Sequence, residues 1–291
     1  MKISIIGAGN VGAMTASRII DADLGDVVLV DIVPGLAKGK ALDISDARPI
    51  TGSKSEIIGS EDFKDMEGSD IVVMTAGLAR KPGMSRDDLL QKNAKIIKDV
   101  AGHIKNICKY SIVIVVTNPL DVMSYVMMKE TGFDPSKVIG MAGVLDSARF
   151  ANVAPENIEK DKVFMMGSHG DTMVAINRSD KLKDEAFKQA ADRARQRGAE
   201  IVSHLKTGSA YFSPSAAAFA MVRTIIKDEQ KTLCASAYLN GEYNEKDIYI
   251  GVPITLGASG VKKVIEIKLT ESEKTSLNKS ANSIRESIKK L

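Results

Sequence analysis

A glycine-rich turn between a strand pattern and a helix pattern constrains the fold of this chain more than any other feature. Residues 2–6 are mostly apolar and β-branched, which is typical of a strand that is buried on both faces. Gly7, Gly9 and Gly12 follow directly, with the spacing G-x-G-x-x-G. After the helix pattern, a second apolar segment ends at Asp31, 19 residues beyond Gly12. The stretch therefore predicts a βαβ unit that contains a phosphate-binding turn.

Each glycine of this turn matches a requirement of pyrophosphate binding. The first permits the tight turn, the second lets the main chain approach the pyrophosphate, and the third lets the helix pack closely on the strand. The free N–H groups of the helix and the positive end of its dipole then face the phosphates. The Asp31 carboxylate can accept hydrogen bonds from an adenosine ribose and would repel a 2′-phosphate. We therefore expect NAD as the cofactor, and a glycine-rich turn that binds nothing is the alternative.

The composition excludes several classes of function. The chain has 291 residues, of which 44% are hydrophobic and 26% are charged, as in a globular protein with one large or two ordinary domains. Its net charge of +3 is small for this length. Proteins that bind nucleic acids or membrane surfaces usually carry a clustered basic face. We therefore expect neither a nucleic acid nor a membrane among its partners.

Cysteine usage and hydropathy indicate a reducing compartment. Cys108 and Cys234 have no C-x-x-C spacing, so we expect two buried, reduced thiols rather than a disulfide or a metal site. The first strand pattern begins at residue 2, which leaves no room for a signal or transit peptide. No apolar run reaches the ~18 residues of a transmembrane helix. The expected location is the cytoplasm.

The first half of the chain alternates buried strands with helices. Crossovers of this length join parallel strands, and such connections are right-handed. We therefore predict an α/β fold, with a Rossmann doubly wound parallel sheet over residues 1–143 as the NAD-binding domain. Its expected strands cover 2–6, 26–32, 55–59, 70–75, 111–117 and 138–143, and its expected helices cover 10–22, a segment from Pro34, 86–109 and 120–130, the last closing at Gly132.

The second half of the chain has shorter strand patterns that alternate more strongly. Alternation of this kind is typical of antiparallel strands with one solvated face. We therefore predict an α+β substrate-binding catalytic domain over residues 144–291, in contact with the first domain because no linker separates them. Its expected strands cover 163–166, 174–177, 233–239, 248–252 and 261–268, and its expected helices cover 184–205, 209–227 and 271–291.

Two arginines follow the strand at 70–75, on the loop after Gly77. Ligands of open α/β sheets bind beyond the carboxyl ends of the strands, where this loop begins. Arg80 and Arg86 flank Lys81-Pro82-Gly83, and a guanidinium pairs with a carboxylate in a bidentate manner. The loop therefore indicates a lid over an anionic substrate. The residues alone leave a solvated basic turn as an equal alternative.

One of the three histidines has the surroundings of a catalytic residue. His103 and His204 lie within helix patterns, and we expect them to be surface or partly packed residues. His169 lies between glycines, directly after the strand pattern at 163–166. Upstream, Asp146 and Arg149 are three residues apart and therefore share one helix face. The acid can orient and stabilise an imidazolium, and the arginine can hold a substrate carboxylate beside it.

These motifs together resemble the lactate/malate dehydrogenase family over essentially the whole chain. The matching pieces are GAGNVG with Asp31, TAGLARKPGMSRDDLL, Asn93, VVTNPLDVM, GVLDSARF and GSHGDTMV. Within the family, the resemblance is to malate dehydrogenases of the lactate-dehydrogenase-like prokaryotic type. Arg80 distinguishes the malate enzymes from the lactate enzymes in this resemblance, because the lactate enzymes have a neutral glutamine at that position. The segments between Arg149 and His169 and over 174–184 are shorter than the family leads us to expect.

The resemblance implies a role for each substrate-site residue. It makes His169 the general acid/base and Asp146 its partner. Arg149 then binds the carboxylate next to the reacting carbon, and Arg86 polarises the carbonyl as the loop closes. Arg80 pairs with the distal carboxylate, which a monocarboxylate such as lactate would leave unpaired.

The resemblance also implies the cofactor site and the reaction. Asn118 contacts both the substrate oxygen and the nicotinamide end, and no metal is implied. The residues assigned to NAD are Gly7, Ala8, Gly9, Asn10, Val11, Gly12, Asp31, Asn93, Val116, Thr117 and Asn118. The implied reaction is the reversible, NAD-dependent oxidation of (S)-malate to oxaloacetate by a homodimer or homotetramer. The alternatives are another 2-hydroxyacid dehydrogenase of the lactate type on the same scaffold and a catalytically silent NAD-binding protein.

Overall fold

Six parallel strands form the first part of a nine-stranded sheet. A computed structural model describes residues 1–79, 83–156, 158–170, 172–180 and 184–291. Hydrogen bonding gives the order β11-β10-β9-β6-β5-β4-β1-β2-β3, so the last six strands of this order have the Rossmann arrangement. These six are β1 (Lys2–Ile6), β2 (Asp26–Val30), β3 (Ile57–Ser60), β4 (Ile71–Met74), β5 (Ile112–Val115) and β6 (Val138–Gly140). The predicted doubly wound parallel sheet is confirmed.

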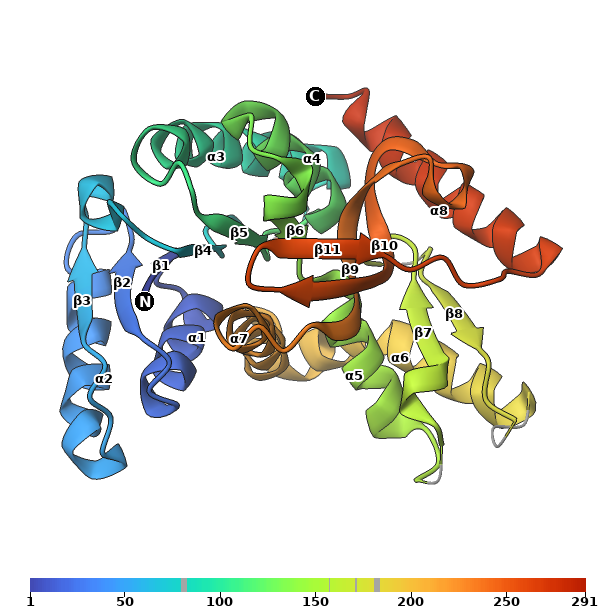
Figure 1. The fold of residues 1–291 in the computed structure, drawn as a ribbon, viewed down its shortest axis with the longest axis horizontal. Coiled ribbons are helices and arrows are strands. Elements are labelled where there is room, and N and C mark those ends of the chain that lie inside the picture. Colours follow the sequence, from blue (N-terminus) through green and yellow to red (C-terminus); the bar gives the residue numbers. More distant parts are fainter. Residues whose placement is uncertain (80–82, 157, 171, 181–183) are drawn as a thin grey trace.

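Helices cover both faces of the parallel strands, as burial of their apolar side chains requires. Every residue of β4 and of β5 is buried. Figure 1 shows α3 and α4 on one side of the sheet and α1 and α2 on the other. The bounds are α1 (Asn10–Asp21), α2 (Leu36–Thr51), α3 (Arg86–Ile107) and α4 (Leu120–Thr131). As predicted, α4 closes at Gly132, which has the left-handed φ of 68°.

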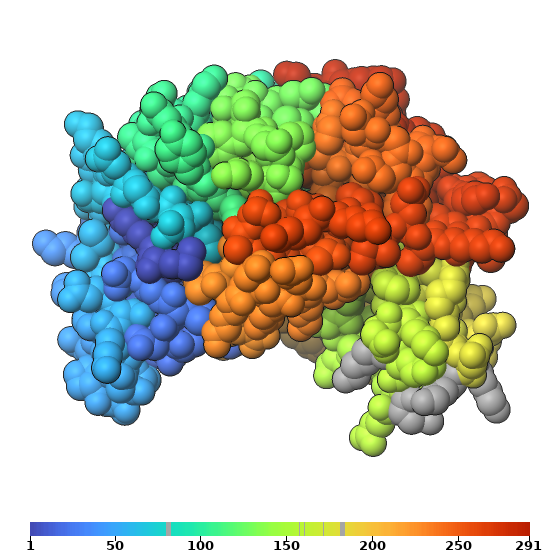
Figure 2. Space-filling view, in the orientation of Figure 1, coloured from blue at the N-terminus to red at the C-terminus, as the bar shows by residue number. Residues whose placement is uncertain are grey.

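The second half of the chain extends the same sheet with antiparallel strands. β9 (Lys231–Asn240) joins β6 through the pair Gly140–Ser236, and β10 (Lys246–Gly257) and β11 (Gly260–Val264) follow. A separate hairpin contains β7 (Val163–Met166) and β8 (Val174–Asn177). In Figure 2 the orange strand region lies directly against the green segment of the first half. The remaining helices are α5 (Ala142–Val153), α6 (Asp184–Leu205), α7 (Phe212–Ile226) and α8 (Glu271–Ile288).

Several predicted boundaries were wrong, and packing between distant segments explains them. The sixth strand ends at Gly140 instead of 143, because α5 begins at Ala142 and Gly143 already packs on β9. A Cβ at Gly143 would lie 2.6 Å from the Cβ of Cys234. β9 and β10 are longer than predicted, because each is the hydrogen-bonding partner of the other.

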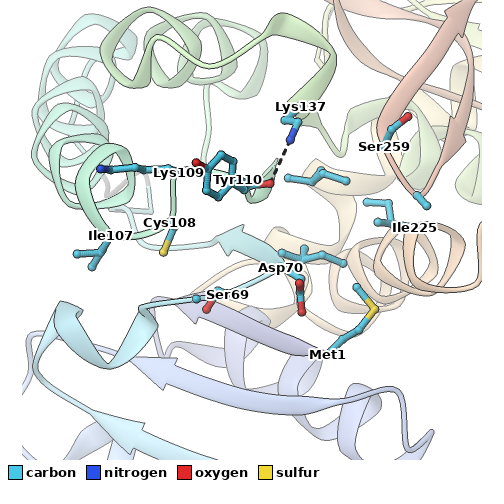
Figure 3. Close-up of a pocket in the computed structure, with 14 residues that line it drawn as sticks. Met1, Ser69, Asp70, Ile107, Cys108, Lys109, Tyr110, Lys137, Ile225 and Ser259 are labelled. Atoms are coloured by element: carbon cyan, nitrogen blue, oxygen red, sulfur yellow. Dashed lines mark hydrogen bonds between the residues drawn. The ribbon is translucent and has the colours of Figure 1, made fainter.

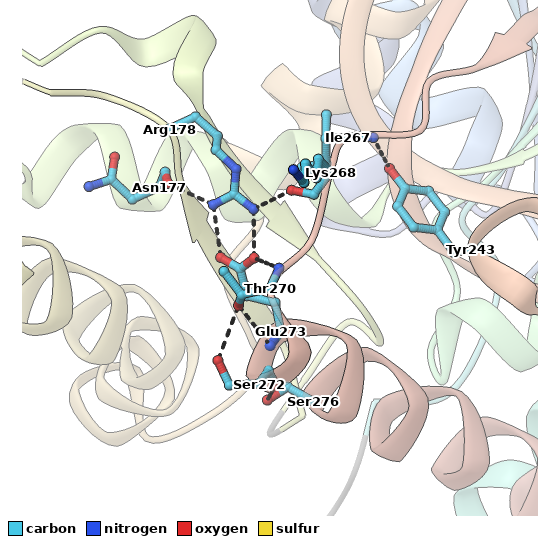
Figure 4. A network of polar contacts seen from close by, with 9 residues as sticks. All are labelled: Asn177, Arg178, Tyr243, Ile267, Lys268, Thr270, Ser272, Glu273 and Ser276. Atoms are coloured by element: carbon cyan, nitrogen blue, oxygen red, sulfur yellow. Dashed lines mark hydrogen bonds and ion pairs between the residues drawn. The ribbon is translucent and has the colours of Figure 1, made fainter.

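The ends of two further elements also differ from the predictions. β11 ends at Val264 instead of 268, because the chain then turns to Tyr243, whose hydroxyl accepts from the Ile267 N–H at 3.0 Å (Figure 4). α7 begins at Phe212 instead of 209. Sequence periodicity does not contain the contact between Tyr243 and Ile267.

The structure places both cysteine side chains in the interior. Cys108 and Cys234 are both free and buried, as predicted. Burial raises the pKa of the Cys234 thiol to about 12, so this thiol is protonated at neutral pH. Among the residues that the structure describes, no helix is both long and apolar enough to cross a bilayer.

An arginine–glutamate pair fixes the start of α8 to the β7–β8 hairpin (Figure 4). The Arg178 guanidinium donates to both carboxylate oxygens of Glu273, at N–O distances of 2.9 and 2.6 Å. Thr270 and Glu273 also form a capping box, in which each side chain accepts from the N–H of the other residue. Glu273 therefore anchors a strand and caps a helix at the same time.

We expect Glu273→Gln to lower the free energy of unfolding by about 1–2 kcal/mol at pH 7, because the cap and the ion pair are both weakened. The hydrogen bond from Arg178 lowers the pKa of the Glu273 carboxyl. Stability from a carboxyl with a lowered pKa is present above its unfolded value of about 4.3 and is lost as the pH falls through the folded value. The unfolding temperatures of the variant and the wild type should differ at pH 7 and become equal in acid.

The control for this experiment is Glu286→Gln on the same helix. Glu286 is an exposed carboxylate that pairs with Lys289 at 2.7 Å, and we expect little change in unfolding temperature from its loss. If Glu273→Gln lowers the unfolding temperature equally at pH 7 and in acid, the ion pair and the cap are not the cause of the destabilisation.

Candidate active site

A cavity of about 530 Å³ lies at the carboxyl ends of the parallel strands, between the two halves of the chain. Open α/β sheets bind their ligands at this edge. The glycine turn after β1, with Gly9 and Gly12, lines one side of it. Arg149 from α5 and His169 from the loop after β7 line another side. Part of the predicted cofactor site and part of the predicted catalytic site therefore face a common space.

The glycine turn has the shape that pyrophosphate binding requires. Gly7 has a φ of 101°, and a Cβ on Gly12 would lie 1.9 Å from the carbonyl oxygen of Gly7. A Cβ on Gly9, by contrast, would meet no atom within 4 Å, so the space in front of Gly9 is open. Gly9 is also the N-cap of α1 and offers its first turn no side-chain acceptor. The N–H groups of this helix end therefore suit an anion, and the turn fits a dinucleotide.

Asp31 holds the glycine turn to the end of β2. One carboxylate oxygen accepts from the Ala8 N–H at 2.6 Å, and the other accepts from the Val33 N–H at 2.9 Å. Each carboxylate oxygen has a second lone pair, so the group keeps acceptor capacity for a ribose hydroxyl. The structure thus gives Asp31 a structural contact that the sequence did not predict.

Asn93 lies behind the cavity wall instead of lining the cavity. It is 1% exposed, and its amide oxygen accepts from the Leu78 N–H at 2.8 Å. Its amide nitrogen donates to the carbonyl oxygen of Asn118 at 2.6 Å. Asn93 therefore joins the loop after β4 to the turn after β5. Val116, Thr117 and Asn118 of that turn do line the cavity.

A histidine, an aspartate and an arginine meet at one end of the cavity. His169 Nδ1 lies 2.8 Å from Asp146 Oδ2, and Arg149 Nη1 lies 3.7 Å from Asp146 Oδ1. The helix α5 supplies both the acid and the arginine, three residues apart. Asp146 is 3% exposed, whereas His169 and Arg149 are 15% and 12% exposed. The acid therefore lies behind the two groups that reach the cavity.

The charges around His169 favour its protonated form. Burial by itself would lower the pKa of His169, but the charge of Asp146 and its hydrogen bond, together with the charge of Asp121, raise the pKa above its ordinary value. Burial lowers the pKa of the Arg149 guanidinium, and Asp146 opposes this shift. Arg149 Nε is buried and has no hydrogen-bond partner among the described residues. A desolvated guanidinium of this kind is suited to bind a carboxylate.

Main-chain contacts on three sides fix the loop that carries His169. Gly167 pairs with Gly251 of β10, with N–O distances of 2.8 and 3.0 Å. The Ser168 N–H donates to Ser280 Oγ of α8 at 2.6 Å. The His169 N–H donates to Asp121 Oδ2 of α4 at 2.9 Å. The position of the imidazole is therefore set from the sheet and from two helices.

Of the two arginines of the predicted lid, the structure describes only Arg86. Arg86 is the first residue of α3, where it is exposed and is not among the residues that line the cavity. Arg80 lies outside the described residues. Leu78 and Ala79 before the loop and Leu89 after it line the cavity. The flanks of the loop therefore reach the site.

One wall of the cavity consists of residues that were not predicted from the sequence. This wall is lined by Gly198 and Val202 of α6, and by the segment Gly208, Ser209, Ala210, Tyr211 and Pro214. The only signal in the sequence is a run of small residues at the start of the helix predicted over 209–227. A Cβ on Gly198 would lie 3.6 Å from Arg149 Nη1, so α6 packs directly on the arginine.

A second cavity, of about 480 Å³, lies at the opposite edge of the sheet (Figure 3). Met1, Asp70 and Cys108 line it near the amino ends of the strands, and Lys137 donates to the carbonyl oxygen of Tyr110 at 3.2 Å. Among the residues that the structure describes, His169 and Arg149 line the first cavity and not this one.

Comparison with known proteins identifies the family. Two family models match, the lactate/malate dehydrogenase NAD-binding domain over residues 1–140 and the lactate/malate dehydrogenase alpha/beta C-terminal domain over residues 144–291. A malate dehydrogenase of Methanosarcina mazei is 47% identical over 100% of this chain and 99% of its own length. The apo malate dehydrogenase of Picrophilus torridus superposes with a TM-score of 0.93 at 40% identity, covering 99% of this chain and 96% of that one.

A lactate dehydrogenase of Cryptosporidium parvum, solved with lactic acid and β-nicotinamide adenine dinucleotide, superposes almost as well. Its TM-score is 0.92 at 36% identity, covering 99% of this chain and 96% of that one. The backbone alone therefore does not separate lactate from malate enzymes. The matched models span both halves of the chain, and the resemblance seen in its motifs is confirmed. The chain belongs to the lactate/malate dehydrogenase family.

Proposed function

We propose that this protein is an NAD-dependent malate dehydrogenase in which His169 is the general acid/base. The observation that carries the proposal is the contact of His169 with Asp146, beside Arg149, on a cavity that also reaches the glycine turn. The relatives named malate dehydrogenase support the activity along the whole chain. The reaction is the reversible oxidation of (S)-malate to oxaloacetate.

The dinucleotide would be held by the glycine turn, by Asp31 and by the turn after β5. When bound, the nicotinamide would supply the hydride acceptor for malate oxidation and the hydride donor for oxaloacetate reduction. Gly9 leaves room for the pyrophosphate, and the N-terminus of α1 favours its negative charge. The Asp31 carboxylate suits a ribose and disfavours a 2′-phosphate, which selects NAD over NADP. Asn93 supports this site from behind the cavity wall through its hydrogen bonds to Leu78 and Asn118.

The protonation state of His169 determines the direction of proton transfer. In malate oxidation the neutral imidazole takes the proton of the hydroxyl, and in oxaloacetate reduction the imidazolium returns it to the carbonyl oxygen. Asp146 favours the imidazolium, so the proton remains available near neutral pH. Arg149 binds the carboxylate next to the reacting carbon and aligns the substrate against His169. Negative charge that develops on the substrate oxygen is thus met by a positioned donor.

The loop arginines complete the recognition of a dicarboxylate. In this proposal Arg80 pairs with the distal carboxylate, Arg86 polarises the carbonyl, and Asn118 contacts the same oxygen. A monocarboxylate would leave Arg80 unpaired in a closed site, at a cost of about 2–5 kcal/mol. A lactate-type 2-hydroxyacid dehydrogenase is the second candidate, because a lactate enzyme has the same backbone.

Steady-state oxidation of NADH tests the function with oxaloacetate and pyruvate side by side. We expect strong selectivity for oxaloacetate, and a further loss of rate when NADPH replaces NADH. A preference for pyruvate would show that the lactate-type alternative is right. Turnover of neither substrate would overturn both assignments and favour a silent NAD-binding protein.

We expect Arg80→Gln to lower the ratio of kcat/KM for oxaloacetate over pyruvate by about 30-fold or more, because the distal carboxylate loses its ionic partner. The measurement is the pair of specificity constants at saturating NADH. Lys81→Gln is the matched control, since it removes one positive charge from the same loop and should leave the ratio unchanged. An unchanged ratio in the Arg80 variant would remove Arg80 from the substrate site.

We extend the proposal to the assembly, the domains and the location. Two units meet near residues 143 and 144, and the protein acts in the cytoplasm as a homodimer or homotetramer. Exposed apolar side chains on or next to α2 support association: Ile32 is 77% exposed, Leu42 58% and Ile50 88%. Sedimentation equilibrium would establish the assembly, and a monomer at all concentrations would exclude it.

A further inference from the structure

A second buried aspartate lies directly behind His169. Asp121, the second residue of α4, is 3% exposed. Its Oδ2 accepts from the main-chain N–H of His169 at 2.9 Å, and its Oδ1 accepts from Ser236 Oγ of β9 at 2.7 Å. The side chain thus joins a helix of the first half, a strand of the second half and the loop of the acid/base.

Among the residues that the structure describes, no cationic side chain forms an ion pair with the Asp121 carboxylate. Among the ion pairs of the described residues, none includes Asp121, so its charge is balanced by other means. Its position in the first turn of α4 places it at the positive end of the helix dipole. The charged groups that bear on it are His169, which favours its ionised form, and Asp146, which opposes that form. Burial and Asp146 therefore raise the pKa of Asp121, and the imidazolium counteracts them.

Coupling between two titrating groups is reciprocal. If the imidazolium stabilises the Asp121 carboxylate, the carboxylate stabilises the imidazolium by the same free energy. The other charged groups facing His169 among the described residues are Asp146 and Arg149 of α5. The contacts from β10 and α8 come from the uncharged Gly251 and Ser280. Two carboxylates and one guanidinium thus set the charge state of this histidine.

We propose that Asp121 is a positioning residue for His169, which holds the main chain of the catalytic loop and stabilises the imidazolium from the side away from the cavity. This inference rests on the proposed role of His169 and deepens it. Asp146 orients the imidazole through the ring nitrogen, whereas Asp121 fixes the backbone from which the ring extends. Asp121 does not line the cavity, so it acts on the reaction only through His169.

Two substitutions separate the charge of Asp121 from its hydrogen bonds. Asp121→Asn removes the charge and can keep both bonds, because its amide oxygen accepts from His169 N–H and its amide nitrogen donates to Ser236 Oγ. Asp121→Ala removes the charge and the bonds together. Glu245→Gln is the control, since Glu245 is a 3% exposed carboxylate that pairs with Arg285, away from His169.

The direct readout is an NMR titration of ¹³Cε1-labelled histidine in the full-length protein. His169→Gln assigns the His169 signal among the three histidines. We expect Asp121→Asn to lower the pKa of His169 by about one unit, and Glu245→Gln to leave it unchanged. The pH at which oxaloacetate reduction falls by half should move down equally. Asp121→Ala should show the same shift and a further loss of kcat of about tenfold, with KM for NADH unchanged.

An unchanged pKa of His169 in Asp121→Asn would overturn the inference. If that variant does not fold, Ser236→Ala is the substitute test. Loss of the Ser236 hydroxyl removes a hydrogen bond that favours the ionised form of Asp121, so the pKa of His169 should fall in this variant too. An unchanged pKa of His169 in Ser236→Ala would equally overturn the inference. The titration needs no substrate. A shifted pKa in a protein that turns over neither oxaloacetate nor pyruvate would therefore support the coupling while overturning the proposed function.

Discussion

His169→Asn should lower kcat/KM for oxaloacetate reduction by about 10²- to 10⁴-fold, because His169 is the only described residue at the cavity whose side chain ordinarily titrates near neutral pH. Asparagine keeps a polar side chain and removes the titratable ring. The glycine turn is unchanged, so binding of NADH, followed by its fluorescence, should persist. Loss of turnover with cofactor binding retained is the signature of a missing acid/base.

The pH dependence of the wild type follows from the same residue. Because the pKa of His169 is raised, the imidazolium persists above the ordinary value of about 6.5. Oxaloacetate reduction needs the proton and should fall as the pH rises through this pKa, whereas malate oxidation needs the neutral ring and should rise over the same range. The residual activity of the variant should lack both transitions.

His204→Asn is the matched control, since His204 is an exposed residue of α6. It should keep wild-type rates and both pH transitions. Substantial turnover by the His169 variant, with its pH profile intact, would show that another group transfers the proton.

Arg149→Met should lower kcat/KM for oxaloacetate by about 30- to 4,000-fold, mainly through a higher KM, because the carboxylate next to the reacting carbon loses a desolvated ionic partner. Methionine approximates the length of the side chain without its charge. The dissociation constant of NADH should stay close to that of the wild type, since Arg149 lies away from the glycine turn in sequence and on another element. The measurement is a pair of saturation curves, one for oxaloacetate and one for NADH.

The same substitution should spare stability. Arg149 is 12% exposed, and its contact with Asp146 is long at 3.7 Å. Its Nε is buried and has no hydrogen-bond partner within the described part of the chain. The buried Asp146 carboxylate keeps a partner in His169, whose Nδ1 lies 2.8 Å from Asp146 Oδ2, so loss of the guanidinium does not leave this carboxylate unpaired. We therefore expect the unfolding temperature to change little while activity collapses.

Arg223→Met on α7 is the control for the loss of an arginine. Arg223 contacts Glu229 at 3.1 Å and does not line the cavity, so its loss should leave both saturation curves unchanged. A normal KM for oxaloacetate in the Arg149 variant would mean that the carboxylate binds elsewhere.

The sequence by itself determined the local elements and the pairs within them. The strand, glycine turn, helix and Asp31 of the first 31 residues follow from hydropathy, glycine spacing and one acid, and the structure contains them. Asp146 and Arg149 are neighbours because three residues is nearly one helical turn. Gly132 ends α4 because glycine adopts a left-handed φ without strain. Each of these properties depends on residues that are close along the chain.

The tertiary structure alone decided which distant segments meet. His169 and Asp146 are 23 residues apart, and Asp121 is 48 residues from the histidine whose backbone it holds. β9 joins β6 although 90 residues separate the ends of these strands, and this pairing carries Ser236 to Asp121. Periodicity reports which face of an element is buried but not which partner covers it. Only the tertiary structure shows that Asp121 contacts the loop of His169 and that the small residues before α7 line the cavity.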